Sequence, residues 1–401
     1  MKQKKICLII DFTARHSYTH MAPLIKVYSE IISANGYQVH ILLSKFAERG
    51  FFDSIMGTKK YNLPSSIYTP ALRESFFVFL FYQLLGKRWA SVTTDSLMKR
   101  SVRRVQILKT VMYLFKTSKL TKGKILLLLP SADPLSIELI KTISKFHFAR
   151  KFCIRIRMVG SESRGVLGHE TIYKDLIQVQ STDKIDLQIG FETQAYADFL
   201  VKKGIDSGCL SWSPWPTFNI EKLISKDESK NTSIGFLGGA KKRKGFDLIP
   251  LIINYLICSG GNYKFFIQKS AYPWVEYHKT LSMLEKEFKN RCEFLPANID
   301  LDKLLKILST LDCLILPYDP ESYKINASGI LYHSADAGIP VVTFSGVGFE
   351  QEIKEYQVGI IVDDLALIEN SILQALKISS TKFEIYNKSR NNANNSFLFT
   401  K

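Results

Sequence analysis

The sequence predicts an α/β protein with two doubly wound parallel-sheet domains that face a cleft. Three observations lead to this fold class. Continuous apolar runs of strand length alternate along the chain with segments of helical periodicity. The alternation stops at a polar stretch rich in proline and tryptophan and then starts again. The chain has 401 residues, of which 46% are hydrophobic, and this is enough for two cores of ordinary size.

The first domain is placed at residues 1–218. A continuous apolar run, typical of a buried parallel strand, predicts a strand at 5–11, and further apolar segments of strand length predict strands at 37–44, 122–133, 151–160 and 184–193. Apolar residues at helical spacing predict its helices at 21–36, 134–146 and 193–204. The last helix has clear boundaries, because Thr193 is a good N-cap residue and Gly204 a good stop signal.

A linker is expected where "SWSPWPTFN" and "SKDESKNTS" interrupt the pattern, and the second domain is placed at 219–376. Its strands are predicted at 233–239, 262–268, 292–297, 312–318, 340–344 and 358–362. Its helices are predicted at 245–261, 280–291, 300–311 and 328–338. Residues 377–401 are expected to form a helical tail that packs back on the first domain.

The net charge of +17 favours an anionic partner, such as a phosphorylated small molecule, a membrane surface or nucleic acid. No nucleic-acid-binding motif is visible, so nucleic acid is not expected. None of the six cysteines forms a CxxC pair, and no DxD-type acidic pair is placed after an apolar strand to hold Mg²⁺. Asp363 and Asp364 follow the last apolar strand, but we expect them to open the next helix. We therefore expect no metal, no cofactor, and reduced thiols in a cytoplasmic protein.

The loop "FLGGAKKRKG" at 236–245 is the strongest local signal for a binding site. Gly238 and Gly239 follow an apolar strand and precede a helix, so their backbone N–H groups are placed to bind an anion. Lys241, Arg243 and Lys244 add positive charge that would stabilise a phosphate leaving group. The alternative interpretation is a solvated basic turn.

Three motifs in order resemble the Rossmann-like, sugar-nucleotide-binding half of GT-B glycosyltransferases, nearest to glycosyltransferase family 4-like enzymes. They are "FLGGAKKRKG", the stretch from "CEFLPANID" to "DCLILPY", and "INASGILYHSADAGIPVV". The resemblance implies that Lys244 and Gly245 match the Lys-Gly pair of the family and that Lys244 binds the donor phosphate. It also implies that the N–H groups of Ser328 and Gly329 hold the second phosphate.

Further donor-binding positions follow from the same resemblance. Ala297 and Asn298 would face the nucleotide base, and Tyr318 would lie near the donor sugar. The alternative interpretation of the loop that contains Tyr318 is a purely structural one. The paired glutamates of the family fall on Ile325 and His333, so the sequence departs from the family there. His333 is able to replace the second glutamate as a hydrogen-bond acceptor for ribose, or it is an ordinary helix histidine.

Polar residues at strand ends of the first domain are the candidates for catalysis and acceptor binding. Asp11, His16 and Glu162 are the candidate catalytic groups, and Arg15, His20 and Arg164 are candidate acceptor ligands. Asp11 has an alternative role as a loop cap, and Glu162 as a surface turn residue.

The resemblance implies a glycosyltransferase that uses a nucleotide-sugar donor. Because no DxD-type pair is present and the basic loop supplies countercharge, we expect the enzyme to be metal-independent. A saccharide or lipid-linked saccharide of a bacterial surface polysaccharide, such as O-antigen, capsule or lipopolysaccharide, is the expected acceptor. The alternatives are a nucleotide-sugar epimerase of the same fold and a non-enzymatic nucleotide- or nucleic-acid-binding protein.

A basic segment at 96–132 contains no Asp or Glu and alternates cationic with apolar residues. This pattern predicts either a helix in the interface of an anionic membrane or a helix packed on the first domain. In the first case the protein is peripheral on the inner face of the cytoplasmic membrane.

Overall fold

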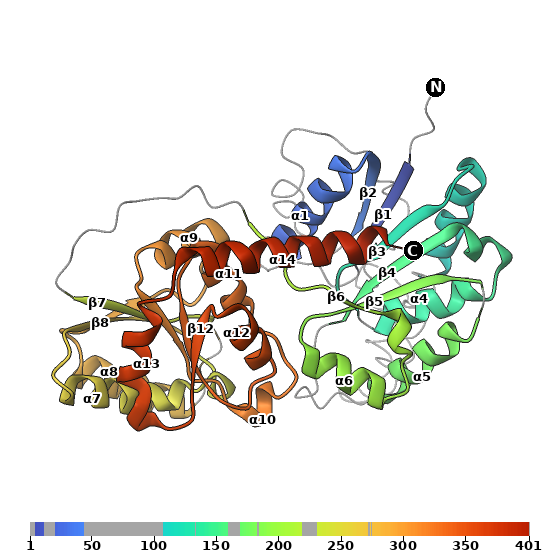
Figure 1. Cartoon of the computed structure of the whole chain (residues 1–401). Coiled ribbons are helices and arrows are strands. Elements are labelled where there is room, and N and C mark those ends of the chain that lie inside the picture. The colour runs from blue at the N-terminus through green and yellow to red at the C-terminus, as the bar shows by residue number, and fades with distance from the viewer. Residues whose placement is uncertain are drawn as a thin grey trace, which may run out of the picture.

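The computed structural model describes residues 5–11, 21–43, 107–132, 134–158, 169–182, 184–218, 231–271, 273 and 275–400. Two parallel six-stranded sheets with flanking helices lie side by side within these ranges (Figure 1). This confirms the α/β class and the arrangement of two doubly wound domains.

The sheet of the first domain has the order β2-β1-β3-β4-β5-β6. Its strands are β1 (Lys5–Asp11), β2 (Tyr37–Leu43), β3 (Ile125–Leu129), β4 (Phe152–Arg157), β5 (Asp186–Phe191) and β6 (Leu210–Trp212). Its helices are α1 (Met21–Ala34), a helix over 107–120, α4 (Pro134–Ser144), η3 (His147–Lys151), α5 (His169–Gln180), α6 (Gln194–Lys202) and η5 (Ser207–Cys209).

Strand β6 corrects the sequence analysis, which assigned Ser211 and Trp212 to the linker. The strand pairs in parallel with β5, with Ile189 opposite Leu210 and Phe191 opposite Trp212. The prolines that suggested a linker begin only at Pro214, so the last short strand fits before them.

The sheet of the second domain has the order β12-β11-β10-β7-β8-β9. Its strands are β7 (Thr232–Phe236), β8 (Tyr263–Gln268), β9 (Cys292–Leu295), β10 (Cys313–Leu316), β11 (Val341–Phe344) and β12 (Gly359–Val362). Its longer helices are α7 (Ile249–Cys258), α8 (Val275–Glu287), α9 (Leu301–Ser309), α11 (Gly329–Ala337), α12 (Glu350–Tyr356) and α13 (Ile368–Ala375). Short helical turns are η6 (Lys242–Lys244), η7 (Phe246–Leu248), α10 (Pro320–Tyr323) and η8 (Leu365–Leu367).

The two domains meet where β5 ends and α6 begins. Thr193 caps α6 as predicted, because its hydroxyl accepts from the N–H of Tyr196 at 3.2 Å. The same hydroxyl donates to the carbonyl of Ile325 in the second domain at 2.8 Å. Beside it, buried Arg157 pairs with Glu192, whose carbonyl accepts a hydrogen bond from Tyr332 of α11 at 3.3 Å. The hydrogen bonds from Thr193 to Ile325 and from Tyr332 to Glu192 therefore join the β5 side of the first sheet to the second domain.

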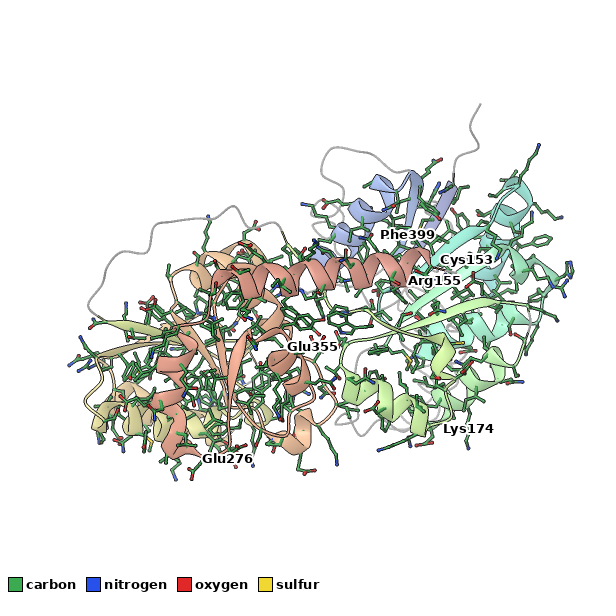
Figure 2. All side chains as sticks on the ribbon, in the orientation of Figure 1. Cys153, Arg155, Lys174, Glu276, Glu355 and Phe399 are labelled. Carbon is green, nitrogen blue, oxygen red and sulfur yellow. The ribbon has the colours of Figure 1, made fainter. Side chains whose placement is uncertain are left out.

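The long helix α14 (Ser380–Phe399) runs from the second domain across to the first (Figure 1). Tyr386 is buried in a core cluster of the second domain, whereas Phe397 and Leu398 are buried in a core cluster of the first. Figure 2 shows Phe399 close to Arg155 of β4, and Arg155 donates a hydrogen bond to the carbonyl of Thr400 at 2.8 Å. The far end of this helix is therefore part of the first domain.

The structure describes residues 107–132 of the basic segment. Its helix packs Ile107, Val111 and Leu114 into the core of the first domain. Among the described helices, none combines the length and the apolar character needed to cross a membrane.

Candidate functional site

The candidate site lies at the carboxyl edge of the second sheet, between β7 and β10. The chain leaves β7 towards β8 and β9 on one side and later returns to β10, β11 and β12 on the other. Such a reversal of strand order opens a crevice in which ligands bind in open α/β sheets. The loops that follow β7 and β10 form the walls of this crevice.

Glycine is required in the loop after β7 for two physical reasons. Gly238, Gly239 and Gly245 have φ angles of 100°, 74° and 69°, in the region that other residues rarely adopt. A Cβ atom on Gly245 would also lie 1.7 Å from the carbonyl oxygen of Pro317. The loops after β7 and β10 are therefore in direct contact, and the N–H of Asp319 donates to the carbonyl of Arg243 at 3.1 Å.

The N–H groups of the glycine loop have a partner that the sequence analysis did not anticipate. Those of Gly238 and Gly239 both donate to Oε1 of Gln268, at 2.8 and 2.7 Å. Nε2 of Gln268 donates in turn to the carbonyl of Ala297 at 2.9 Å. Gln268 thus ties together the loops after β7, β8 and β9. In this structure its amide oxygen takes the place that we predicted for a phosphate oxygen.

The side chain of Lys244 joins the glycine loop after β7 to the loop after β10. Its Nζ donates to the carbonyl of Gly238 at 2.7 Å and lies 5.2 Å from the ring centroid of Tyr318. Burial lowers the pKa of Lys244 because the low-dielectric surroundings disfavour the charged ammonium. An anionic ligand beside it would offset this penalty.

Tyr318 connects the loop after β10 to helix α11. Its hydroxyl lies 3.2 Å from Oγ of Ser328, within hydrogen-bond distance. Burial raises the pKa of Tyr318 to about 12, so the phenol stays protonated at neutral pH. Ser328 is also the N-cap of α11 and accepts from the N–H of Leu331 at 3.4 Å.

Two of the predicted donor residues border open space. A Cβ atom built on Gly239 or on Gly329 would meet no other atom within 4 Å. Gly329 is the first residue of α11, where backbone N–H groups and the helix dipole favour an anion. The open side of the glycine loop and the start of α11 thus offer room for a ligand.

Arg243 lies between the glycine loop and a neighbouring cavity of the second domain. Its guanidinium carbon lies 5.6 Å from the ring centroid of Tyr323, and the rings of Tyr323 and Tyr318 are 4.3 Å apart. Arg243 and Tyr318 line a cavity of about 820 Å³, whose wall also includes Lys242, Asp319 and Asp363. This volume falls in the range of small-molecule sites.

The remaining predicted donor residues of the second domain differ in solvent exposure. Lys241 and Asn298 have exposed side chains beside the crevice. His333 is only 1% exposed, and its ring lies 6.0 Å from that of Trp215 and 5.4 Å from that of Phe218. Residues before the second domain therefore cover His333, and a ribose hydroxyl has no access to it in this arrangement.

The candidate residues of the first domain are described only in part. Asp11 ends β1 beside β3, where the order of the first sheet reverses, and it is 1% exposed. The other candidates lie outside the described residues: Arg15, His16, His20, Glu162 and Arg164.

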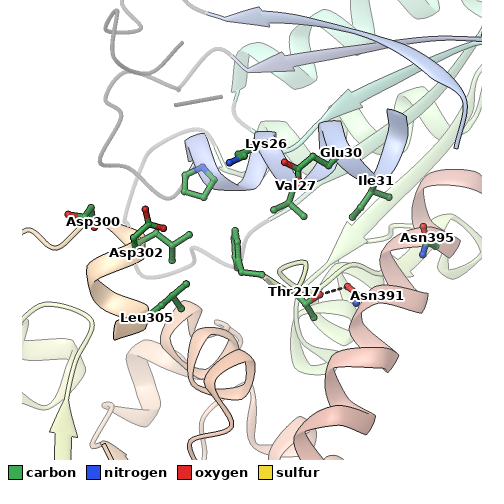
Figure 3. Close-up of a pocket in the computed structure, with 13 residues that line it drawn as sticks. Lys26, Val27, Glu30, Ile31, Thr217, Asp300, Asp302, Leu305, Asn391 and Asn395 are labelled. Atoms are coloured by element: carbon green, nitrogen blue, oxygen red, sulfur yellow. Dashed lines mark hydrogen bonds between the residues drawn. The ribbon is translucent and has the colours of Figure 1, made fainter. Parts of the chain in front are cut away.

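A second cavity, of about 690 Å³, lies between the two domains (Figure 3). Lys26, Val27 and Glu30 of α1 face it from the first domain, and Asp302 and Leu305 of α9 from the second. Its walls combine carboxylate, ammonium and amide groups with apolar side chains. Groups of this kind bind sugar hydroxyls and the apolar faces of sugar rings.

Comparison with solved structures covers nearly the whole chain. The lipopolysaccharide outer core galactosyltransferase WaaB, in its apo form, is 13% identical with a TM-score of 0.61, over 97% of this chain and 99% of that one. The chain has the GT-B fold. Anabaena Alr3699/HepE in complex with UDP is 12% identical, with a TM-score of 0.60 over 98% and 95% of the two chains.

The sucrose-phosphate synthase of Thermosynechococcus elongatus is also similar, at 12% identity and a TM-score of 0.57, over 98% of this chain and 95% of that chain. At such identities the GT-B likeness shows the fold. No family model and no curated protein matches the sequence.

Proposed function

We propose that this protein is a glycosyltransferase that moves a sugar from a nucleotide-sugar donor to a saccharide acceptor. The observation that carries the proposal is the convergence of three predicted elements at the β7/β10 crevice. These are the glycine loop with Lys244, Tyr318 after β10, and the Ser328–Gly329 start of α11. Structural neighbours support the choice of donor, because HepE was solved in complex with UDP and with UDP-glucose.

In this proposal the donor diphosphate occupies the crevice between the glycine loop and α11. The ammonium of Lys244 and the N–H groups at the start of α11 would hold it. Cleavage of the donor bond leaves negative charge on the diphosphate, and fixed positive groups at that position lower the barrier. The basic loop would supply the countercharge in place of a metal ion, and the donor is a substrate, so no further cofactor is needed.

For the acceptor we propose the cavity between α1 and α9. The helix α1 begins directly after the 12–20 segment, which holds the candidates Arg15, His16 and His20. Asp11 at the end of β1 stays our candidate for accepting the acceptor proton, together with His16 and Glu162. The neighbour WaaB is a galactosyltransferase of the lipopolysaccharide outer core. Its similarity supports an acceptor from a bacterial surface polysaccharide or its lipid-linked precursor, used at the cytoplasmic face of the membrane.

A thermal-shift panel of nucleotide sugars and free nucleotides tests the donor. A ligand that binds only the folded state raises the melting temperature by mass action. We expect one nucleoside diphosphate and its sugar conjugate to raise it together, with unrelated nucleotides as controls. If no member of a complete panel shifts the melting temperature, the proposal is wrong.

The stabilising donor is then incubated with candidate saccharides, and the products are analysed. Release of nucleoside diphosphate together with a longer saccharide supports transfer. Conversion of the donor sugar to its epimer in the absence of any acceptor would instead identify an epimerase.

A further inference from the structure

The helix at 107–120 has apolar residues on two adjacent faces, whose centres lie about 100° apart around the helix axis. One face is the packed one, formed by Ile107, Val111 and Leu114. On the other face Leu108, Met112 and Phe115 are 61%, 53% and 41% exposed. Their spacing of four and three residues places them in one stripe. Packing on the first domain therefore leaves the stripe of Leu108, Met112 and Phe115 exposed.

The exposed stripe continues onto the neighbouring turn η3. The ring of Phe148 lies 5.5 Å from the rings of both Phe115 and Phe146, and Phe146 is 44% exposed. Lys151 fixes the turn to the helix, because its Nζ donates to the carbonyls of Ser118 and Thr121 at 2.6 and 3.0 Å. The exposed apolar side chains of the helix and of η3 thus form one continuous surface.

Positive charge surrounds this stripe. The segments 107–124 and 145–152 contain no Asp or Glu. Their cations are Lys109, Lys116, Lys119, Lys122, Lys124, Lys145, Arg150 and Lys151. Nζ of Lys119 lies 4.4 Å from the ring centroid of Phe115, so cation and apolar groups alternate at close range. We call the surface formed by these two segments the basic-apolar face.

We propose that the basic-apolar face docks on an anionic lipid bilayer. Cations attract the acidic headgroups, and aliphatic and aromatic side chains gain free energy by entering the boundary between headgroups and acyl chains. A nucleic acid would satisfy the cations but would leave Leu108 and Met112 in water. The combination of both kinds of group therefore favours lipid.

The position of this face suits an enzyme that works beside a membrane. The end of the helix lies near the amino edge of the first sheet, because the carbonyls of Ser118 and Thr121 accept hydrogen bonds from Lys151, which directly precedes β4. The helix is about 20 Å long, and its exposed apolar stripe from Leu108 to Phe115 covers about 10 Å of that length. In Figure 1 the teal helix lies at the outer side of the first domain, away from the second. The docked protein would therefore leave the cleft between the domains open alongside the bilayer.

Sedimentation of the full chain with vesicles tests the proposal without any assay of glycosyl transfer. Vesicles of phosphatidylcholine are compared with vesicles that also contain phosphatidylglycerol, at low and high salt. We expect binding only to the anionic vesicles, weakened by salt because screening acts on exposed charges. If the protein stays in the supernatant with anionic vesicles at low salt, the proposal fails, while donor binding in the thermal-shift panel is unaffected.

Paired variants separate specific docking from general charge. Leu108→Ser with Met112→Ser removes exposed side chains and leaves the packed face intact. We expect it to lower the partition coefficient at least 10-fold. Leu251→Ser, at a residue that is 54% exposed on α7 of the second domain, is the matched control and should change nothing.

For the charges, Lys116→Gln with Lys119→Gln should lower partitioning roughly 25-fold, about 5-fold per lysine. Lys279→Gln with Lys286→Gln, on exposed positions of α8, is the control. Equal losses in test and control variants would show that only net charge matters and would overturn the proposal. Loss of single-stranded DNA binding in the test variants, with vesicle binding unchanged, would identify a nucleic-acid surface instead.

Discussion

Nζ of Lys244 donates to the carbonyl oxygen of Gly238 at 2.7 Å, so the one lysine that the proposal places on the donor phosphate also fastens the glycine loop. The same ammonium lies over the ring of Tyr318. A substitution of Lys244 therefore affects both ligand binding and loop geometry, and an experiment must separate the two.

Lys244→Ala should lower donor affinity and turnover by about 10- to 100-fold, the effect of losing one charge-assisted hydrogen bond. Lys244→Met keeps much of the aliphatic stem on Tyr318 and should retain more thermal stability than the alanine variant. Calorimetry with the nucleoside diphosphate and thermal melting of both variants make the comparison. Donor affinity equal to that of the wild type in a folded Lys244→Met protein would remove Lys244 from the site.

Gln268 allows a test of the loop geometry with two variants. Gln268→Ala leaves the N–H groups of Gly238 and Gly239 without their acceptor, and we expect a loss of about 1–3 kcal/mol in unfolding free energy together with weaker donor binding. Gln268→Glu keeps an acceptor for both N–H groups but adds negative charge near the proposed phosphate. It should bind the donor at least as poorly as the alanine variant while melting at a higher temperature. Donor affinity unchanged in both variants would separate Gln268 from ligand binding.

Substitution of His333 tests whether its side chain serves packing or contacts the ribose of the donor. Because the ring is buried beside Trp215 and Phe218, His333→Ala should cost on the order of 2–3 kcal/mol of unfolding free energy through the cavity it leaves. His278→Ala, at an exposed histidine of α8, is the control and should be nearly neutral. Urea unfolding measures both. A stable His333→Ala protein that no longer binds nucleoside diphosphate would restore the ribose role.

The pH dependence of stability should report on Glu352, which is buried and accepts a hydrogen bond from Tyr386 of α14. Burial raises the pKa of Glu352 to about 8 from its ordinary value of 4.5. The folded protein then holds a proton that the unfolded chain releases. The stabilisation is therefore complete below about pH 4.5 and is lost as pH rises towards 8, by at most about 1.4 kcal/mol per pH unit.

Glu352→Gln removes this titration, so the variant should gain stability relative to the wild type between pH 5 and pH 8 and match it most closely at the acid end. Urea unfolding at several pH values measures the difference. A constant difference across this range would show that Glu352 does not titrate in the folded protein.

Local signals in the sequence were sufficient for most of the fold. The cap at Thr193 and the helix end at Gly338 depend on residues close in the chain, and both are present as the sequence indicates. The glycine loop, Tyr318 and Ser328 come together because they follow strands that the apolar pattern identified. Parallel strands bring their carboxyl ends to one edge, which makes such positions predictable.

Contacts between distant segments were not predictable in the same way. Gln268 reaches the glycine loop only because β8 lies next to β7, and its one sequence signal is a polar side chain at the end of an apolar strand. His333 is buried by Trp215 and Phe218, which precede it by more than a hundred residues. The helical periodicity around His333 does not show which distant residues will pack over its side chain.

Helix α14 has a consequence for the order in which the protein is made. Phe397 and Leu398 complete the apolar cluster that includes Cys7, Ile9 and Tyr28, yet they are translated after the entire second domain. A nascent chain therefore carries an unfinished first domain on the ribosome until α14 emerges and docks. Chaperones that recognise exposed apolar surface have their longest opportunity during this interval, and a chain that stops before α14 would remain a substrate for proteases.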